Sequence, residues 1–267
     1  MRGPKVYDNW IGNMWNNYKL RCPDGTVWQV GKKISEKSLY TTDLSGGKCP
    51  AEAEAQAVYH CIQVVQGAVT QQRAIMKVRM QYVVIHVDNL VYTTNIWDRV
   101  PPINMSNLSL QARAEIAQKQ PAFWTQFEVH ALRHFNAKKC TTVPKLLNLV
   151  ATLQNHSYTP VPNGYLIFLV MEELPGVPLT GFWKYGRLKR DKIRASFLRS
   201  LEELFSVHGS PGDCKLENLI YDEKTDTCYF VDFEETWVTE DEPILKVSDD
   251  DYFLWGLARS VDGEDIY

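Results

Sequence analysis

The sequence predicts an α+β protein with a strand-rich N-terminal part and a helix-rich C-terminal part. Its 267 residues, 45% of them hydrophobic and 23% charged, are typical of a globular chain that can bury one large or two small cores. Short runs of β-branched and aromatic residues recur along the first two thirds of the chain, as strands require. Two longer stretches, ending near residues 135 and 207, repeat apolar residues at the spacing of amphipathic helices.

The bulk properties argue against several classes of protein. A net charge of −3 gives no overall attraction to nucleic acid or to an anionic membrane. The sequence contains no apolar run long enough to span a bilayer and no secretory signal at its start. The six cysteines include no C-x-x-C pair, so a zinc knuckle is not indicated. We therefore expect reduced thiols in an intracellular, cytoplasmic protein.

The first predicted elements are an irregular arm over residues 1–25 and a hairpin behind it. Residues 26–30 and 39–44 read as the two strands of the hairpin, and residues 31–38 as its turn. Backbone N–H groups around Gly31 could bind phosphate in such a turn. An ordinary hairpin explains the same residues equally well.

A helix is predicted over residues 50–67, either as an insertion between strands or as part of a small lobe. Pro50 suits the first turn of a helix, and alanine recurs through the first half of the segment. The preceding Gly-Gly-Lys at 46–48 lacks the earlier glycine and the following Ser or Thr of a phosphate-binding P-loop, so that motif is rejected.

A lysine and a glutamate stand in unusually apolar surroundings. Lys77 lies in a predicted strand at 73–80, and Glu128 lies on the apolar stripe of a predicted helix. A carboxylate on such a stripe is costly unless a cation meets it, and Lys77 is the natural candidate. Glu115 is a rival partner for Lys77. The alternatives are an ordinary edge lysine and a glutamate at the margin of the stripe.

The middle of the chain alternates between insertion, strands and helix. Residues 81–120 are predicted to be an insertion that ends in a helix over 109–120. Apolar runs at 143–154 and 165–172 are predicted strands joined by a proline-containing turn. Residues 188–207 form a strongly amphipathic helix pattern.

The most informative stretch covers residues 208–234. Asp213 and Asn218 stand five positions apart, and an apolar run, a polar turn and a second apolar run then lead to Asp232. This order predicts loop, strand, hairpin turn and strand, which brings the three side chains to one end. Two carboxylates and an amide oxygen suit Mg²⁺, and a remaining carboxylate can orient a hydroxyl nucleophile. The alternative is an Asp-rich surface hairpin with nothing bound.

These residues resemble the D-x-K-x-x-N and D-F-x motifs of the protein-kinase-like superfamily, with Asp213, Lys215 and Asn218 in the first motif and Asp232, Phe233 and Glu234 in the second. The resemblance is to divergent, fungal-type protein kinases and aminoglycoside-phosphotransferase-like enzymes. It implies a bilobal α+β fold with an antiparallel-sheet N-lobe and a short helical C-lobe. It also implies that Asp213 is the catalytic base, that Lys215 contacts phosphate, and that Asn218 and Asp232 bind metal.

The resemblance assigns further roles outside this stretch. Lys77 and Glu128 would hold the phosphates of a nucleotide, and the turn at Gly31 would cover them. Backbone groups of Glu173 and Leu174 would bind adenine where the second apolar run ends. A plain turn after a buried strand is the alternative for these last two residues.

The chain also departs from the family pattern. Pro211-Gly212 replaces the His-Arg that precedes the catalytic Asp in protein kinases, whereas His208-Gly209 is similar to the His-Gly of small-molecule kinases. Glu234 replaces the glycine of D-F-G, as is common in the small-molecule and fungal-type branches. By the same resemblance Asp251 would brace the catalytic loop from below.

The expected organisation has three parts. An arm at 1–25 precedes an N-lobe at 26–173, and a truncated C-lobe follows at 174–267. The N-lobe contains insertions at about 45–70 and 81–120. The boundary after residue 173 follows from the structure-breaking Pro175-Gly176 pair.

The function expected from the resemblance is an ATP- and Mg²⁺-dependent transfer of phosphate to a hydroxyl acceptor, either a protein or a small molecule. The alternative is a kinase-shaped pseudokinase or scaffold that binds nucleotide without turnover. Neither interpretation involves nucleic acid or a membrane as a partner.

Overall fold

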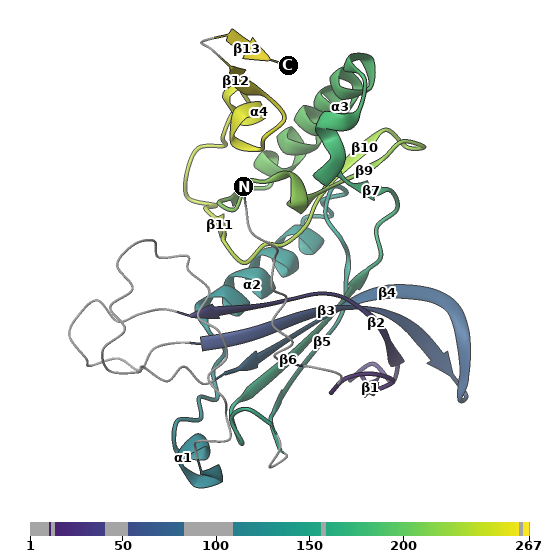
Figure 1. Ribbon diagram of the computed structural model, residues 1–267, viewed down its shortest axis with the longest axis vertical. Helices are drawn as coiled ribbons and strands as arrows, with labels where there is room; N and C mark the ends of the chain where they lie inside the picture. The colour runs from purple at the N-terminus through teal and green to yellow at the C-terminus, as the bar shows by residue number, and fades with distance from the viewer. Residues whose placement is uncertain are drawn as a thin grey trace, which may run out of the picture. The chain divides into compact units, whose positions relative to one another are not determined.

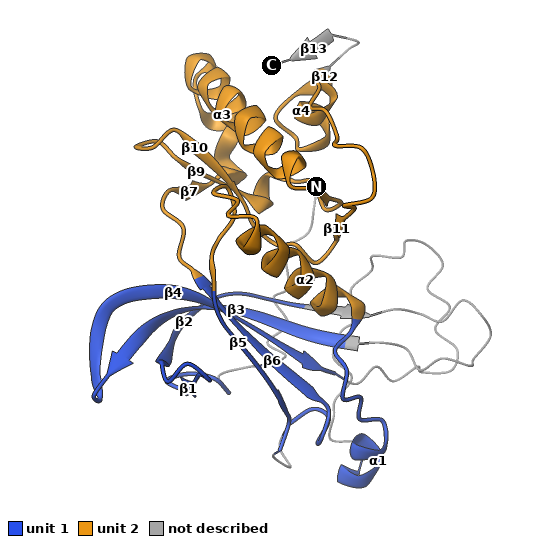
Figure 2. Ribbon diagram, turned by 180° about the vertical axis from the view of Figure 1, so that it is seen from behind, with its two compact units in different colours: residues 1–122, 147–171 blue, residues 123–146, 172–267 orange. Residues whose placement is uncertain are grey.

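The computed structural model confirms the predicted α+β class and describes residues 11, 14–40, 53–82, 109–155, 159–261 and 264–266. The chain divides into two compact units, drawn in different colours in Figure 2. The first unit comprises residues 1–122 and 147–171, and the second comprises 123–146 and 172–267. The expected division, 26–173 and 174–267, assigned residues 123–146 to the N-terminal part, whereas these residues belong to the second unit.

A six-stranded sheet forms most of the first unit, in the order β1-β2-β3-β4-β6-β5. Its strands are β1 (Lys19–Arg21), β2 (Val27–Tyr40), β3 (Ala53–Val65), β4 (Ala68–Gln81), β5 (Leu146–Leu153) and β6 (Tyr165–Glu172). Figure 1 shows the long antiparallel strands β2, β3 and β4 bending together. The two edges of the curled sheet are linked, because Asn148 of β5 donates hydrogen bonds to Asp24 and Thr26 between β1 and β2.

One face of this sheet forms the apolar core of the first unit. Every second residue along β3 and β4 is buried in it, and these are Ala55, Ala57, Tyr59, Cys61, Ala74, Met76, Val78 and Met80. Trp15, from the predicted N-terminal arm, packs edge-to-face against Phe168 of β6 with ring centroids 5.1 Å apart. The described residues of the arm therefore help to cover the sheet.

Two predictions for the N-terminal strands are wrong. Residues 31–38 are not a turn, because β2 continues through them with register irregularities between Val30 and Ser35. Residues 50–67 are not a helix, since β3 begins at Ala53. The helix propensity of alanine is overridden there because a strand between β2 and β4 buries alternate residues on the core face.

Among the described residues, two helices precede β5. Helix α1 (Leu110–Glu115) is shorter than the predicted 109–120 and begins at Ser109, whose side chain accepts a hydrogen bond from the Ala112 N–H. Helix α2 (Phe123–Ala137) belongs to the second unit. It buries the predicted stripe of Trp124, Glu128, Ala131, Leu132 and Phe135. Residues 83–108 of the predicted insertion lie outside the described residues.

The second unit contains the remaining helices and short strands. Its helical segments are η2 (Leu179–Lys184), α3 (Arg187–Ser206), η3 (Leu216–Asn218) and α4 (Asp250–Leu254). A three-stranded sheet has the order β10-β9-β7, with β7 (Val177–Pro178), β9 (Leu219–Asp222) and β10 (Thr227–Phe230). Two ribbons pair β8 (Gly209–Pro211) with β11 (Thr236–Val238) and β12 (Arg259–Val261) with β13 (Glu264–Ile266).

The predicted helix at 188–207 is confirmed as α3, which buries Ile193, Phe197, Leu201 and Leu204. Gly176 permits the approach of β7 to β9. Its φ is +103°, and a Cβ atom there would lie 2.3 Å from the carbonyl oxygen of Tyr221. Only glycine fits this position without displacing the backbone.

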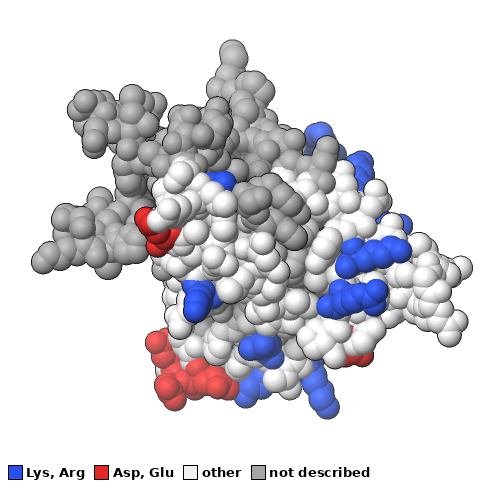
Figure 3. Space-filling model, turned by 90° about the horizontal axis from the view of Figure 1, so that it is seen from below, with Lys and Arg blue, Asp and Glu red and all other residues white. Residues whose placement is uncertain are grey.

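Three bulk expectations concern the membrane, the cysteines and the surface charge. Among the described helices, none is both long and apolar enough to cross a bilayer. The five cysteines in the described part of the chain are free thiols. On the described part of the face in Figure 3, Lys and Arg side chains are interspersed with uncharged residues, and acidic side chains lie in several places, most of them at the lower left. This face therefore presents no continuous basic surface.

Candidate functional site

The hairpin predicted around residues 219–231 is confirmed, and it fixes two of the site residues. Strand β9 pairs antiparallel with β10, from Leu219 opposite Phe230 to Asp222 opposite Thr227. The Asp222 carboxylate accepts hydrogen bonds within the turn, which stabilises it. At the open end, the Val231 N–H donates to the carbonyl of Asn218 over 3.0 Å. Asp232, the residue after Val231, therefore lies close to Asn218.

A second backbone contact brings Asp213 toward the segment after β10. The β8–β11 ribbon pairs Pro211 with Thr236, and the Gly212 N–H donates to the Glu235 carbonyl over 2.7 Å. A Cβ atom on Gly212 would lie 2.4 Å from the Trp237 ring and 2.8 Å from the Glu235 carbonyl oxygen, so a larger residue would push the two segments apart. Asp213, which follows Gly212, and Glu234, which precedes Glu235, are therefore held close together.

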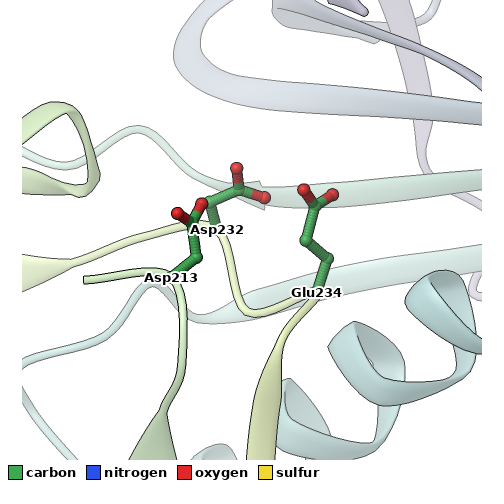
Figure 4. Close-up of side chains that lie close together, drawn as sticks. All are labelled: Asp213, Asp232 and Glu234. Carbon is green, nitrogen blue, oxygen red and sulfur yellow. The ribbon is translucent and has the colours of Figure 1, made fainter. Parts of the chain in front are cut away.

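Three carboxylates converge between these two backbone contacts. Asp213, Asp232 and Glu234 each offer an oxygen, and these oxygens lie within 4.8 Å of one another. Figure 4 shows the three side chains leaving two chain segments with their carboxylate groups directed toward the same region. Negative groups this close repel one another, and a divalent cation between them would remove the repulsion.

The backbone at Asp232 is in the left-handed region, with φ at +68°. This conformation is uncommon outside glycine, although Asp and Asn tolerate it better than other residues. Such conformations persist where the surroundings enforce them and are frequent at functional sites. The hydrogen bond from Val231 to Asn218 is one such constraint.

Asp213 is held by the two other polar residues of its motif. The Asn218 amide nitrogen donates to the Asp213 carbonyl oxygen over 2.9 Å and to its carboxylate over 3.1 Å. The Lys215 ammonium forms an ion pair with the same carboxylate. Since the nitrogen of Asn218 is directed to Asp213, its amide oxygen is the atom that could bind a metal. The four predicted residues Asp213, Lys215, Asn218 and Asp232 thus meet at one place.

Glu234 is the site residue that the sequence analysis did not include. It is only 3% exposed and belongs to the carboxylate cluster. The sequence interpretation treated it as a departure from the D-F-G pattern. The sequence shows a carboxylate two positions after Asp232, but strand alternation could not place it on the same side, because the backbone at Asp232 is left-handed and not extended. Only the fold shows that the two carboxylates meet.

Helix α2 supports both segments of the site through one aromatic side chain. Phe233 is buried and packs against Phe135 of α2 with ring centroids 5.3 Å apart. Gly209 also lies against Phe135, since a Cβ atom there would be 2.6 Å from the ring. The same helix buries Glu128, which is 1% exposed. A change in α2 is therefore expected to affect the carboxylate site.

The other predicted nucleotide contacts are distributed over both units. Gly31 is an exposed residue of β2 and Lys77 a buried residue of β4, both in the first unit. Glu128, Glu173 and Leu174 belong to the second unit, the last two directly after β6. Pairing of Lys77 with Glu128 would join the two units, and it stays a prediction, as do the roles of Gly31, Glu173 and Leu174.

The rival partner Glu115 is in a different environment from Lys77. It lies at the exposed end of α1 and accepts a hydrogen bond from Gln111 of its own helix over 3.1 Å. Lys77 is 4% exposed. An exposed carboxylate with a local partner gains little from a buried lysine, so Glu115 is the less favoured partner.

Asp251 lies near the loop that it was expected to brace. Its carboxylate accepts a hydrogen bond from the Ser248 N–H over 2.8 Å at the start of α4. Burial, with the charges of Asp213 and Asp251, raises the pKa of the Cys214 thiol to about 11. Asp251 therefore acts electrostatically on the residue next to Asp213.

No protein-family model and no curated protein matches this chain. Among solved structures, it is similar to the Cydia pomonella granulovirus kinase PK-1, with 17% identity and a TM-score of 0.42, over 79% of this chain and 52% of that protein. It is also similar to the bifunctional kinase-methyltransferase WbdD, with 19% identity and a TM-score of 0.34, over 64% of this chain and 31% of that protein. The chain thus spans about half of the first protein and about a third of the second. Both likenesses are distant, and neither assigns a function.

Proposed function

We propose that this chain is a phosphotransferase of the protein-kinase-like superfamily that uses ATP and Mg²⁺ to phosphorylate a hydroxyl acceptor. The observation that supports this function most strongly is the meeting of Asp213, Asp232 and Glu234 beside Asn218. A surface hairpin with nothing bound would not require three carboxylates within 4.8 Å of one another.

The donor set suits a magnesium site. Asp232, Glu234 and the amide oxygen of Asn218 are hard oxygen ligands of the kind that Mg²⁺ prefers. The bound ion would supply neutralisation of phosphate charge during transfer. Because Glu234 is buried, it binds the ion without competition from bulk water. The sequence motif alone offered two of these three ligands.

Asp213 and Lys215 act on the acceptor and the transferred group. Asp213 orients the acceptor hydroxyl and takes its proton, and Asn218 holds the carboxylate in position for this task. The Lys215 ammonium lies against Asp213, where it can stabilise negative charge on a phosphoryl group. Catalysis in this arrangement comes mainly from positioning and from charge stabilisation.

The nucleotide contacts follow the family pattern. Lys77, positioned through Glu128, binds phosphate oxygens, and Glu173 and Leu174 hydrogen-bond adenine through their backbone groups. Gly31 is the least supported contact, because it lies within a strand and not in a turn. The acceptor is a hydroxyl of a small molecule or of a protein, because Glu234 is common to the small-molecule and the fungal-type branches. We also propose that the protein works inside the cell.

The proposal is tested by measuring Mg²⁺-dependent ATP turnover and Mg²⁺–ATP thermal shift. Asp232→Asn and Glu234→Gln are expected to lower turnover by about a hundredfold or more, because each removes charge-stabilising contacts. Asp241→Asn, at an exposed carboxylate outside the cluster, serves as the matched control. A wild-type thermal shift without turnover would favour the scaffold alternative. If wild type shows neither, the proposed function is wrong.

A further inference from the structure

Two arginines of the second unit contact the same tryptophan ring. The guanidinium carbon of Arg190, from α3, lies 4.9 Å from the centre of the Trp183 ring, and that of Arg259, from β12, lies 4.3 Å from it. The ring is fixed in turn, because the indole N–H of Trp183 donates to the Gly256 carbonyl over 3.1 Å. The two guanidinium groups are therefore held within about 10 Å of each other.

These two guanidinium groups are not neutralised by the protein. In the part of the chain that the structure describes, the side chains of Arg190 and Arg259 form no ion pair and donate no hydrogen bond. An aromatic face attracts a cation, but the N–H groups at the edge of a stacked guanidinium still require acceptors. The Nε–H of Arg190 is even buried without one. A donor in this state favours a ligand that supplies acceptor oxygens.

The helix that carries Arg190 has an excess of positive charge around it. Arg187, Arg190 and Arg194 lie on one side of α3, because they are spaced by three and four residues. Asp191 pairs with Arg194 over 2.7 Å and contacts Arg187 at 3.8 Å. Burial lowers the pKa of Arg194, and the charge of Arg190 acts in the same direction. Three cations of α3 thus share the carboxylate of Asp191, and Arg259 adds a fourth.

The position of these arginines within α3 also favours an anion. Arg187 is the first residue of the helix and Arg190 is the fourth, so both lie at the positive end of the helix dipole. The first turn contains no acidic residue, and Gly186 at the N-cap provides no side-chain hydrogen bond. Cations at this end raise the electrostatic energy of the folded state, and a bound anion lowers it.

We propose that Arg190 and Arg259, beside the Trp183 ring, bind the phosphate group of a phosphate monoester. Guanidinium groups match phosphate oxygens through paired N–H···O bonds of about 2.8 Å, so different oxygens of one phosphate accept from both arginines. The excess of positive charge favours a phosphate dianion over a singly charged carboxylate. None of these residues belongs to the carboxylate cluster of Asp213, so the proposal does not rest on the proposed function.

The test is calorimetric binding of phosphate ligands without Mg²⁺, so that the proposed metal site does not contribute. The ligands are glucose 6-phosphate, a phosphoserine peptide, the unphosphorylated peptide and inorganic phosphate. Wild type is expected to bind at least one of the two esters and not the unphosphorylated peptide. Arg190→Gln and Arg259→Gln should each raise the Kd for the ester about tenfold or more, because each removes charge-assisted hydrogen bonds.

Two further variants separate a specific site from general attraction. Lys192→Gln is the matched control, because Lys192 is an exposed residue of the same helix and the change removes the same charge. It should leave the Kd within about twofold of wild type, since salt screens exposed charges. Arg259→Lys keeps the charge but loses the planar fork, so its affinity should lie between those of wild type and Arg259→Gln. Arg259 is exposed, so its variants provide the test even if Arg190→Gln does not fold.

The proposal is wrong if wild type binds neither ester, or if Arg259→Gln binds as tightly as wild type. Equal weakening by Lys192→Gln would also overturn it, because the cause would then be overall charge. Binding of inorganic phosphate without either ester would exclude an ester as the ligand. Tighter binding of the phosphoserine peptide than of the sugar phosphate would support a protein side chain as the source of the ester, and the reverse order would support a small molecule.

Discussion

Charged side chains gather in both units of the molecule, but their signs are arranged in opposite ways. In the first unit, the carboxylate of Glu54 pairs with Arg79 over 2.5 Å and also accepts a hydrogen bond from the Tyr165 hydroxyl over 3.1 Å. In the second unit, three carboxylates lie within 4.8 Å of one another. The first group is a pair of opposite charges, whereas the second brings three carboxylates together, one of which is paired with the Lys215 ammonium.

This difference distinguishes a structural group from a binding group. In a balanced buried pair, each charge compensates the other without a bound ligand. Removing either member therefore leaves an uncompensated buried charge. Removing one member of a cluster of like charges should instead raise the stability of the folded state, unless a cation is bound to the cluster. The two groups should therefore respond to charge removal with opposite changes in stability.

The largest effect is expected for Arg79→Met. This change leaves the Glu54 carboxylate buried without its cation, which should lower the free energy of unfolding by about 3–5 kcal/mol. Chemical denaturation monitored by circular dichroism measures the change. The double variant Glu54→Leu/Arg79→Met is the control and should recover most of the loss, because no unpaired charge remains. A double variant as unstable as the single one would show that packing, not charge balance, explains the effect.

A smaller effect is expected for Tyr165→Phe, which removes the hydroxyl donor to Glu54. The loss should be about 1.5–3 kcal/mol, the range for a hydrogen bond to a charged group. Burial, and then the charge of Glu54, raises the pKa of Tyr165 above its ordinary value. The phenol therefore stays protonated and keeps donating as the pH rises through 10, the usual pKa of tyrosine.

Ultraviolet difference titration of Tyr165→Phe against wild type tests this pH behaviour. The native wild-type protein should show no ionisation of Tyr165 near its usual pKa. An ionisation at that pH, together with unchanged stability of the variant, would show that the Tyr165 hydroxyl does not stabilise the Glu54 carboxylate.

The two units also differ in how much of them the sequence revealed. The hairpin that contains Asn218 and Asp232 was predictable because its strands are close in sequence and its turn is stabilised by local contacts of Asp222. Strand β3 was not, because alanine favours helices and only pairing with β2 and β4 makes the segment extended. Local sequence patterns therefore predicted the hairpin, whereas the extended conformation of β3 depends on its neighbouring strands in the sheet.

The same reasoning explains which charged residues were missed. The pairing of Glu54 with Arg79 depends on the register between β3 and β4, which the sequence does not display. Glu234 was missed for a different reason. Its position two residues after Asp232 was visible, but it was interpreted as a deviation from a family motif and not as a ligand.

The smallest change in stability, with the opposite sign, is expected for Asp232→Asn. Without Mg²⁺ this variant should be more stable than wild type by up to about 1 kcal/mol, because one of three mutually repelling charges is gone. Asparagine tolerates the left-handed backbone at this position, so the substitution adds no strain. Thermal denaturation with and without Mg²⁺ measures both the intrinsic gain and the response to the ion.

The response to Mg²⁺ decides between a binding group and a second balanced group. Wild type should gain stability as Mg²⁺ is added, since an ion that binds only the folded state shifts the unfolding equilibrium, and Asp232→Asn should lose most of that gain. Asp241→Asn should behave like wild type, because its carboxylate is exposed and outside the cluster. If Asp232→Asn is instead destabilised without Mg²⁺, as Arg79→Met is expected to be, then the carboxylates of the second unit are internally balanced. Their convergence would then be structural, and the contrast between the two units would disappear.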